Sequence, residues 1–246
     1  MRLIKINATN STNSFLKELA QNSSLEEYTI AVANTQTSGR GQMSNSWISE
    51  PYKNLTFSIF TPLTKLKIKH QAYLNFAVSL AIYDTLLSYN VPKLSIKWPN
   101  DIMSAEKKIC GILIETTFSH LEIKNTIIGI GLNVNQEKFP KKLFNASSLK
   151  NILKKEIDLE PLMNIIVEKI KYRVSSIELG EFSKTHEEYH EALYKRGIPT
   201  AFIDKKTKLL FMGIITGVSS IGNLQIQLED DTIVKYGLKE ISFAKV

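Results

Sequence analysis

The sequence predicts an α/β protein (α+β in its arrangement), with a mixed β-sheet flanked by helices and a small C-terminal β-barrel. Residues 28–34 and 126–135 are apolar, β-rich runs typical of buried strands, and residues 71–88 carry apolar side chains at helical spacing. From Arg196 onward, short β-runs alternate with turn residues, which is the pattern of a small all-β unit. We therefore expect two domains, residues 1–195 and residues 196–246.

The composition is that of a soluble globular protein. Hydrophobic residues make up 43% of the chain and charged residues 22%. No apolar run approaches the roughly 20 residues that span a bilayer, and the first residues lack the apolar core of a signal peptide. The single cysteine, Cys110, lies within an apolar run. We expect a cytoplasmic protein with a buried, unreactive thiol and no membrane association.

The net charge of +7 comes mainly from lysines spread along the chain. Of the 31 lysines and arginines, four are arginines: Arg2, Arg40, Arg173 and Arg196. No dense basic stripe with interleaved aromatic residues indicates a nucleic-acid surface. Solvated lysine faces are the default interpretation, and an acidic protein or a phosphate-bearing ligand is the open alternative.

The first candidate site is a polar cluster at the start of a helix. A short strand over residues 3–6 precedes Ser11, Thr12 and Asn13, and apolar residues at helical spacing follow from Phe15. These are helix-capping residue types, so capping alone is the plainer interpretation. A polar binding site is the alternative, because helix starts present unpaired backbone donors.

A long polar loop follows the strand at residues 28–34. Its candidate site residues are Gln36, Gly39, Arg40, Gly41, Gln42 and Trp47. A loop of this length in a compact domain is often functional. A guanidinium group between two glycines suits a carboxylate or phosphate, and Trp47 is placed to anchor the far end. We expect residues 39–46 to be mobile without ligand and to close over it.

Residues 95–115 are typical of two strands joined by a short connection. Pro99 ends the first strand, because it removes a backbone donor. The polar residues of the connection are Asn100, Asp101 and Lys108. A lysine that enters a buried strand needs an anionic partner, although a hairpin with a solvated tip is the alternative. Gly111 interrupts the second strand and indicates a bulge or a ligand close to the backbone.

Two glycines interrupt the apolar strand at residues 126–135. Gly129 and Gly131 indicate a flat ligand or another backbone packed against the sheet. A third glycine and a following helix are missing, which excludes a dinucleotide fingerprint. Asn133, at the end of the strand, either binds a ligand or caps a turn.

Two further helices are expected, starting at Glu160 and over residues 182–194. The second holds His186 and His190 at a spacing that can bind zinc. No third ligand stands out, so a solvated helix face is the preferred interpretation.

Five motifs, in this order, resemble those of biotin–protein ligases. They are Ser-Thr-Asn at 11–13, Gln-x-x-Gly-Arg-Gly at 36–41 with Trp47, Lys-Trp-Pro-Asn-Asp at 97–101, Lys-Ile-Cys-Gly-Ile-Leu-Ile-Glu at 108–115, and Gly-Ile-Gly-Leu-Asn-Val at 129–134. With the C-terminal barrel, the resemblance covers essentially the whole chain. It implies a catalytic domain like that of class II aminoacyl-tRNA synthetases and an SH3-like C-terminal barrel.

The resemblance also implies a two-step reaction. ATP, with Mg²⁺, and biotin form biotinyl-5′-AMP, and a lysine of a biotin carboxyl carrier protein then attacks the acyl carbon. Lys108 and Arg40 would neutralise the developing charge. The resemblance assigns biotin contacts to Ser11, Thr12 and Gln36, and biotin or adenylate contact to Asn13. It implies backbone approach at Gly111, adenylate contacts for residues 39–42 and Asn133, and loop anchoring for Trp47. Asn100 and Asp101 would orient the nucleotide, Mg²⁺ or the incoming amine.

Two departures from the family pattern modify these expectations. The family loop is rich in arginine, whereas Gln42, Met43, Ser44 and Asn45 stand at its later positions here. We expect weaker retention of the adenylate. Ser11 also comes too early for a preceding helix-turn-helix domain, so no DNA binding is expected. A monomer or a homodimer fits equally well. The alternatives are a lipoate- or octanoate-handling relative and a non-enzymatic biotin sensor.

Overall fold

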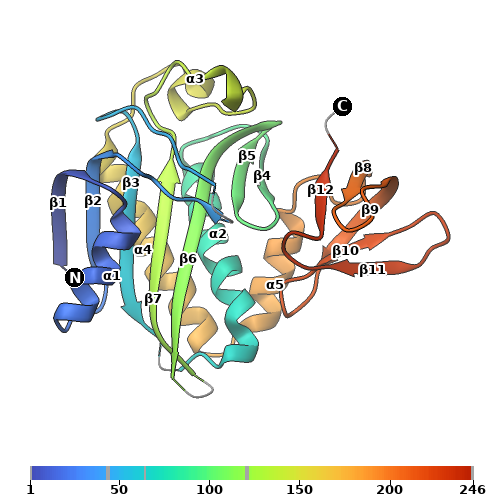
Figure 1. Ribbon diagram of the computed structural model, residues 1–246, viewed down its shortest axis with the longest axis horizontal. Helices are drawn as coiled ribbons and strands as arrows, with labels where there is room; N and C mark the ends of the chain where they lie inside the picture. Colours follow the sequence, from blue (N-terminus) through green and yellow to red (C-terminus); the bar gives the residue numbers. More distant parts are fainter. Residues whose placement is uncertain (1, 43–44, 64, 120–121, 245–246) are drawn as a thin grey trace.

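The computed structural model describes residues 2–42, 45–63, 65–119 and 122–244. Within these ranges, a seven-stranded mixed sheet and a five-stranded antiparallel sheet form the framework (Figure 1). The first sheet has the order β1-β2-β3-β7-β6-β5-β4, in which only β1 and β2 pair in parallel. The predicted α/β fold class with a second, C-terminal β-sheet is confirmed.

The elements have the following bounds. The strands of the larger sheet are β1 (Arg2–Thr9), β2 (Thr29–Gln36), β3 (Leu55–Pro62), β4 (Leu94–Lys97), β5 (Asp101–Ser104), β6 (Lys107–Ser119) and β7 (Glu122–Leu132). The α-helices are α1 (Thr12–Asn22), α2 (Gln71–Ser88), α3 (Leu149–Leu153), α4 (Leu159–Glu178) and α5 (Phe182–Glu191). The strands of the smaller sheet are β8 (Pro199–Asp204), β9 (Leu210–Val218), β10 (Leu224–Gln227), β11 (Ile233–Tyr236) and β12 (Ile241–Phe243).

Helices cover the larger sheet and bury its central strands. Helix α1 contacts β2, β3 and β7 around a small core of Leu16, Ala31, Phe60 and Ile127. The main core includes residues from α2, α4, β3 and β7. Because both faces of β3 are buried, its polar residues Thr56 and Ser58 lie inside the protein. Burial raises the pKa of Cys110, as expected for an unreactive thiol.

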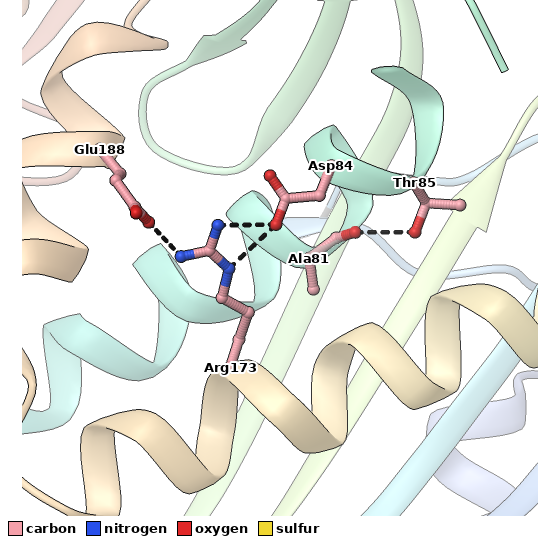
Figure 2. Close-up of polar contacts among 5 residues, drawn as sticks. All are labelled: Ala81, Asp84, Thr85, Arg173 and Glu188. Carbon is pink, nitrogen blue, oxygen red and sulfur yellow. Dashed lines mark hydrogen bonds and ion pairs between the residues drawn. The ribbon is translucent and has the colours of Figure 1, made fainter. Parts of the chain in front are cut away.

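Arg173 joins three helices behind the sheet. Figure 2 shows its guanidinium on α4 between Asp84 of α2 and Glu188 of α5. Arg173 Nε and Nη2 donate to Asp84 Oδ2 over 2.9 and 2.7 Å, while Nη1 contacts Glu188. This arginine therefore stabilises the packing of the three helices.

The region that the sequence predicts as two strands contains three. Residues Asp101–Ser104 form β5, which pairs with both β4 and β6. A run of four residues that begins with an aspartate gives almost no periodicity, so this strand is invisible to pattern analysis. The β5–β6 pairing is irregular between Ile102 and Met103, close to Gly111, where the sequence indicates a bulge.

The smaller sheet has the order β11-β10-β9-β8-β12 and packs against the larger one. Ile96 donates to Ala192 O over 2.7 Å and accepts from Tyr194 N over 2.9 Å, which ties β4 to the connection between the sheets. Trp98 Nε1 donates to Gly222 O over 2.9 Å, between β9 and β10. The segment before Pro99 is thus held by the C-terminal sheet.

The interpretation of the α5 histidines as a solvated face is wrong. Nε2 of His186 and Nε2 of His190 lie 2.6 and 2.8 Å from Val218 O on β9, with ring centroids 4.2 Å apart. Sequence periodicity cannot show that a separate sheet covers this helix. The described residues contain no group of three or more histidine, cysteine, aspartate or glutamate side chains that could hold a metal ion. They also contain no helix long and apolar enough to cross a membrane.

Candidate functional site

A cavity of about 750 Å³ lies between the two sheets. The predicted site residues that line it are Ser11, Thr12, Asn13, Gln36, Arg40, Gly41, Gln42, Trp47, Asn100, Asp101, Lys108 and Gly111. They come from α1, β2, the loop after β2, and the β4–β6 region. The fold therefore gathers segments about 100 residues apart into one site.

The N-terminal cluster is buried, and the Ser11 side chain does not cap the helix. Ser11 occupies the N-cap position of α1 but makes no side-chain capping bond. Thr12 donates from both its backbone N and its Oγ1 to Gln36 Oε1, over 2.8 and 3.2 Å. This bond fixes the orientation of the Gln36 amide. The Gln36 amide nitrogen and the Ser11 hydroxyl have no hydrogen-bond partner among the described residues, so both are available at the cavity wall.

Asn13 is used inside the protein. Its Oδ1 lies 2.6 Å from Ser58 Oγ, and its Nδ2 donates to Glu115 Oε2 over 2.7 Å and to Leu113 O over 3.2 Å. The side chain packs on Gly129, where an added Cβ would lie 2.2 Å from Asn13 Oδ1. Asn13 therefore holds the start of α1 on the sheet.

The loop after β2 folds back on itself. Gly41 N donates to Asn45 O over 2.7 Å, and Trp47 N donates to Gly39 O over 2.8 Å. Arg40 lies between these two hydrogen bonds in the folded-back loop, and its side chain pairs with Glu115 of β6. The predicted mobility of residues 39–46 includes Met43 and Ser44, which lie outside the described residues.

Trp47 rests on the glycines of the central strands. A Cβ added to Gly131 would lie 2.3 Å from Trp47 Cε2, and one added to Gly111 would lie 3.0 Å from Trp47 Cζ3. The sequence analysis expects a flat ligand or another backbone over Gly129 and Gly131. In the structure the Trp47 indole covers Gly131 and the Asn13 side chain covers Gly129. These close approaches explain why glycine stands at positions 129 and 131.

A lysine–carboxylate pair lies at the cavity wall beside Trp47. Lys108 Nζ is 2.6 Å from Asp101 Oδ1 and lies 5.6 Å from the centroid of the Trp47 ring. Lys97 also lines the cavity, 4.4 Å above the Phe243 ring of β12. Burial, with added repulsion from Lys108, lowers the pKa of Lys97, while Asp101 acts in the opposite direction. This part of the wall thus carries two lysines and one carboxylate.

Two predicted residues have supporting positions. Asn100 Nδ2 donates to Ile112 O over 2.7 Å, and Asn100 O accepts from Ile112 N over 3.0 Å, so this residue fastens the turn to β6. Asn133 does not line the cavity. Its Nδ2 donates to Ser147 O over 3.0 Å, while its buried Oδ1 has no partner among the described residues. Gly39 faces a separate cleft behind the loop.

Sequence analysis missed the contribution of the C-terminal sheet. Lys205, Lys208 and Lys239, on the β8–β9 and β11–β12 connections, line the cavity together with Phe243. The default interpretation of lysines as solvated faces is wrong for these three. No local pattern separates a lysine in such a turn from a solvated one. Only the docking of the two sheets brings them to the site.

The fold and this cavity define an α/β ligand-binding domain that is completed by a C-terminal β-sheet. The model of the biotin/lipoate A/B protein ligase family matches residues 6–133, slightly more than half of the chain. The chain therefore belongs to this family.

Similar proteins place the chain near the biotin branch of the family. It is 28% identical over 247 residues to the bifunctional ligase/repressor BirA of Bacillus spizizenii, covering 99% of this chain and 73% of that protein. It is 28% identical over 131 residues to the biotin–[acetyl-CoA-carboxylase] ligase of Mycobacterium tuberculosis, covering 52% and 47%. The biotin protein ligase of Aquifex aeolicus, solved with biotin and ATP, matches with a TM-score of 0.83 and 25% identity, covering 100% and 99%. The resemblance indicated by the motifs is confirmed.

Proposed function

We propose that this chain is an ATP-dependent biotin–protein ligase. It joins biotin to AMP and then transfers biotin to a lysine of a biotin carboxyl carrier protein in the cytoplasm. The observation that carries the proposal is the mixed lining of the cavity. It combines neutral hydrogen-bonding groups from Ser11 and Gln36 with the cations Arg40, Lys97 and Lys108. Such a cavity suits a ligand with a neutral polar ring and an anionic end.

In the first step, a carboxylate oxygen of biotin attacks the α-phosphorus of ATP, and pyrophosphate leaves. Lys108 and Arg40 offset the negative charge that keeps the two anions apart and that builds up on the phosphoryl oxygens. Asp101 holds Lys108 in place, since their charged atoms are 2.6 Å apart. The lysines of the C-terminal sheet add positive charge beside the same cavity.

Magnesium is part of this proposal as a companion of the nucleotide. Mg²⁺ is usually held by one or two carboxylates together with substrate phosphates. Asp101 is a carboxylate on the cavity wall and fits that role. The ion would supply further charge neutralisation for the phosphates.

In the second step, the uncharged amine of the carrier lysine attacks the acyl carbon of biotinyl-5′-AMP. The C–N bond forms, the C–O bond to AMP breaks, and the proton of the amine passes to solvent or phosphate. Closure of the Arg40 loop would keep water from the same carbon. This transfer requires no covalent intermediate between biotin and a residue of the enzyme.

The test is the mass of a carrier domain after incubation with the enzyme, ATP and biotin. The proposal predicts a gain of one biotinyl group on a single lysine, and none without ATP. A parallel reaction with lipoate distinguishes the substrate. Modification with lipoate alone would overturn the biotin assignment, and no modification with either acid would overturn the ligase assignment.

A further inference from the structure

Arg40 has an ion-pair partner that the motif analysis does not assign to the site. Its Nη2 pairs with Glu115 Oε1 on β6, and the other carboxylate oxygen, Oε2, accepts from Asn13 Nδ2 over 2.7 Å. One carboxylate thus contacts both the loop after β2 and the start of α1. Asn13 is buried, whereas the Arg40 and Glu115 side chains are 41% and 28% exposed.

Glu115 stands behind the loop and outside the cavity. It lines a separate cleft together with Gly39, Arg40 and Leu113, and it is absent from the cavity lining. A ligand in the cavity therefore meets Arg40 but not Glu115. Any influence of Glu115 on the ligand has to pass through Arg40 or Asn13.

The ion pair with Glu115 restricts the movement of the Arg40 side chain. Arg40 lies between two glycines, and its long side chain loses much conformational freedom when it is held in one place. Glu115 lies within the long pairing of β6 with β7, opposite Ile127, so its backbone is a fixed attachment point for the loop. Within the described residues, Arg40 makes no other hydrogen bond or ion pair. Its remaining N–H groups are therefore available to an anion.

We propose that Glu115 is a positioning residue that aims Arg40 at the anionic group of the bound adenylate. Through Asn13, the same carboxylate connects the loop to the part of the cavity that holds Ser11. This inference rests on the proposed ligase function. Exposed ion pairs add little to fold stability. We therefore expect the loss of this pair to change the retention of the ligand and not the stability of the fold.

The test is the dissociation of a non-reactive sulfamoyl analogue of biotinyl-5′-AMP, which requires no catalysis. The variants are Glu115→Gln, Glu115→Asp, Arg40→Ala and the double variant Glu115→Gln/Arg40→Ala. A matched control is Glu160→Gln, which removes the exposed Lys5–Glu160 pair away from the cavity. We expect about fivefold to tenfold faster release from Glu115→Gln, partial rescue by aspartate, wild-type release from the control, and unchanged melting temperatures.

The double variant decides whether Glu115 acts through Arg40. We expect it to release the analogue no faster than Arg40→Ala alone. Additive effects, or wild-type release from Glu115→Gln, would overturn the proposal. A lower melting temperature with unchanged release would also do so, since Glu115 would then be purely structural. Failure of the ligase function would appear differently, as wild-type protein that does not bind the analogue.

Discussion

At the scale of single residues, hydrogen bonds inside the protein decide which polar groups remain for a ligand. Thr12, Asn13 and Asn100 direct their polar atoms to other residues, whereas the Ser11 hydroxyl and the Gln36 amide nitrogen stay available. These roles cannot be read from residue type. The same motif therefore contains both ligand-facing and supporting residues.

The loss of loop arginines has a testable consequence at Gln42, which lines the cavity. We expect Gln42→Arg to slow the release of biotinyl-5′-AMP by about tenfold, because a charged hydrogen bond contributes about 1.5–3 kcal/mol. Stopped-flow measurement of adenylate release checks this. The control is Gln21→Arg on the exposed end of α1, which adds the same charge elsewhere. Equal release rates in all three proteins would contradict the role assigned to position 42.

Gly129 leaves room for the Asn13 side chain. A methyl group at this position would lie 2.2 Å from Asn13 Oδ1, so Gly129→Ala forces Asn13 away from Ser58. We expect a loss of about 1–3 kcal/mol in the free energy of unfolding and weaker biotin binding. Urea unfolding and isothermal titration with biotin measure both. Gly111→Ala, where the nearest atom is 3.0 Å away, should be milder. Wild-type stability and affinity in Gly129→Ala would refute this account.

At the scale of elements, periodicity predicts long elements well and short ones poorly. Helix α2 begins and ends where the sequence places it, at Gln71 and Ser88, because its apolar residues repeat over many turns. The short β-runs predicted after Arg196 form the five strands of the C-terminal sheet. Strand β5 and the contact of α5 with β9 escape prediction. The first is too short for a pattern, and the second depends on how separate units pack.

The contact between α5 and β9 predicts that the stability of the protein depends on pH. Burial, with repulsion from His186 and Arg196, lowers the pKa of His190 below its ordinary value of about 6.5. The unfolded chain therefore takes up a proton at a higher pH than the folded one. The stability contribution is present above pH 6.5 and is lost as the pH falls through the folded pKa.

The variant His190→Gln separates this effect from general acid denaturation. We expect its free energy of unfolding to change less than that of the wild type between pH 7.5 and pH 5.5. Urea unfolding at the two pH values provides the comparison. The interpretation fails if both proteins lose the same free energy over this interval.

At the scale of the whole molecule, two sheets complete one site and the net charge is +7. An acidic carrier domain would be attracted to this surface, and salt screens such attraction with a Debye length of about 10 Å at 0.1 M. We expect kcat/KM for the carrier to fall as NaCl rises from 50 to 300 mM, with a smaller change in adenylate formation. Steady-state kinetics of both half-reactions test this. A carrier step that is insensitive to salt would exclude electrostatic steering.

The family and the general location of the site follow from the sequence, because five motifs keep their order along the chain. The completed cavity does not, since Lys205, Lys208 and Lys239 reach it only when the C-terminal sheet docks on the larger sheet. Local patterns carry no information on that docking. The sequence therefore predicts the binding segments, and the structure adds a cationic wall.

The most direct test of the proposed function is biotin-dependent exchange of labelled pyrophosphate into ATP. We predict exchange in the wild type and a loss of about 10²–10³-fold in Lys108→Ala, as for removal of a group that stabilises developing charge. The neighbouring Lys107, which lies outside the cavity lining and donates to Phe144 O over 3.0 Å, provides the control Lys107→Ala. That variant should retain exchange. No exchange in the wild type, or full exchange in Lys108→Ala, would contradict the account.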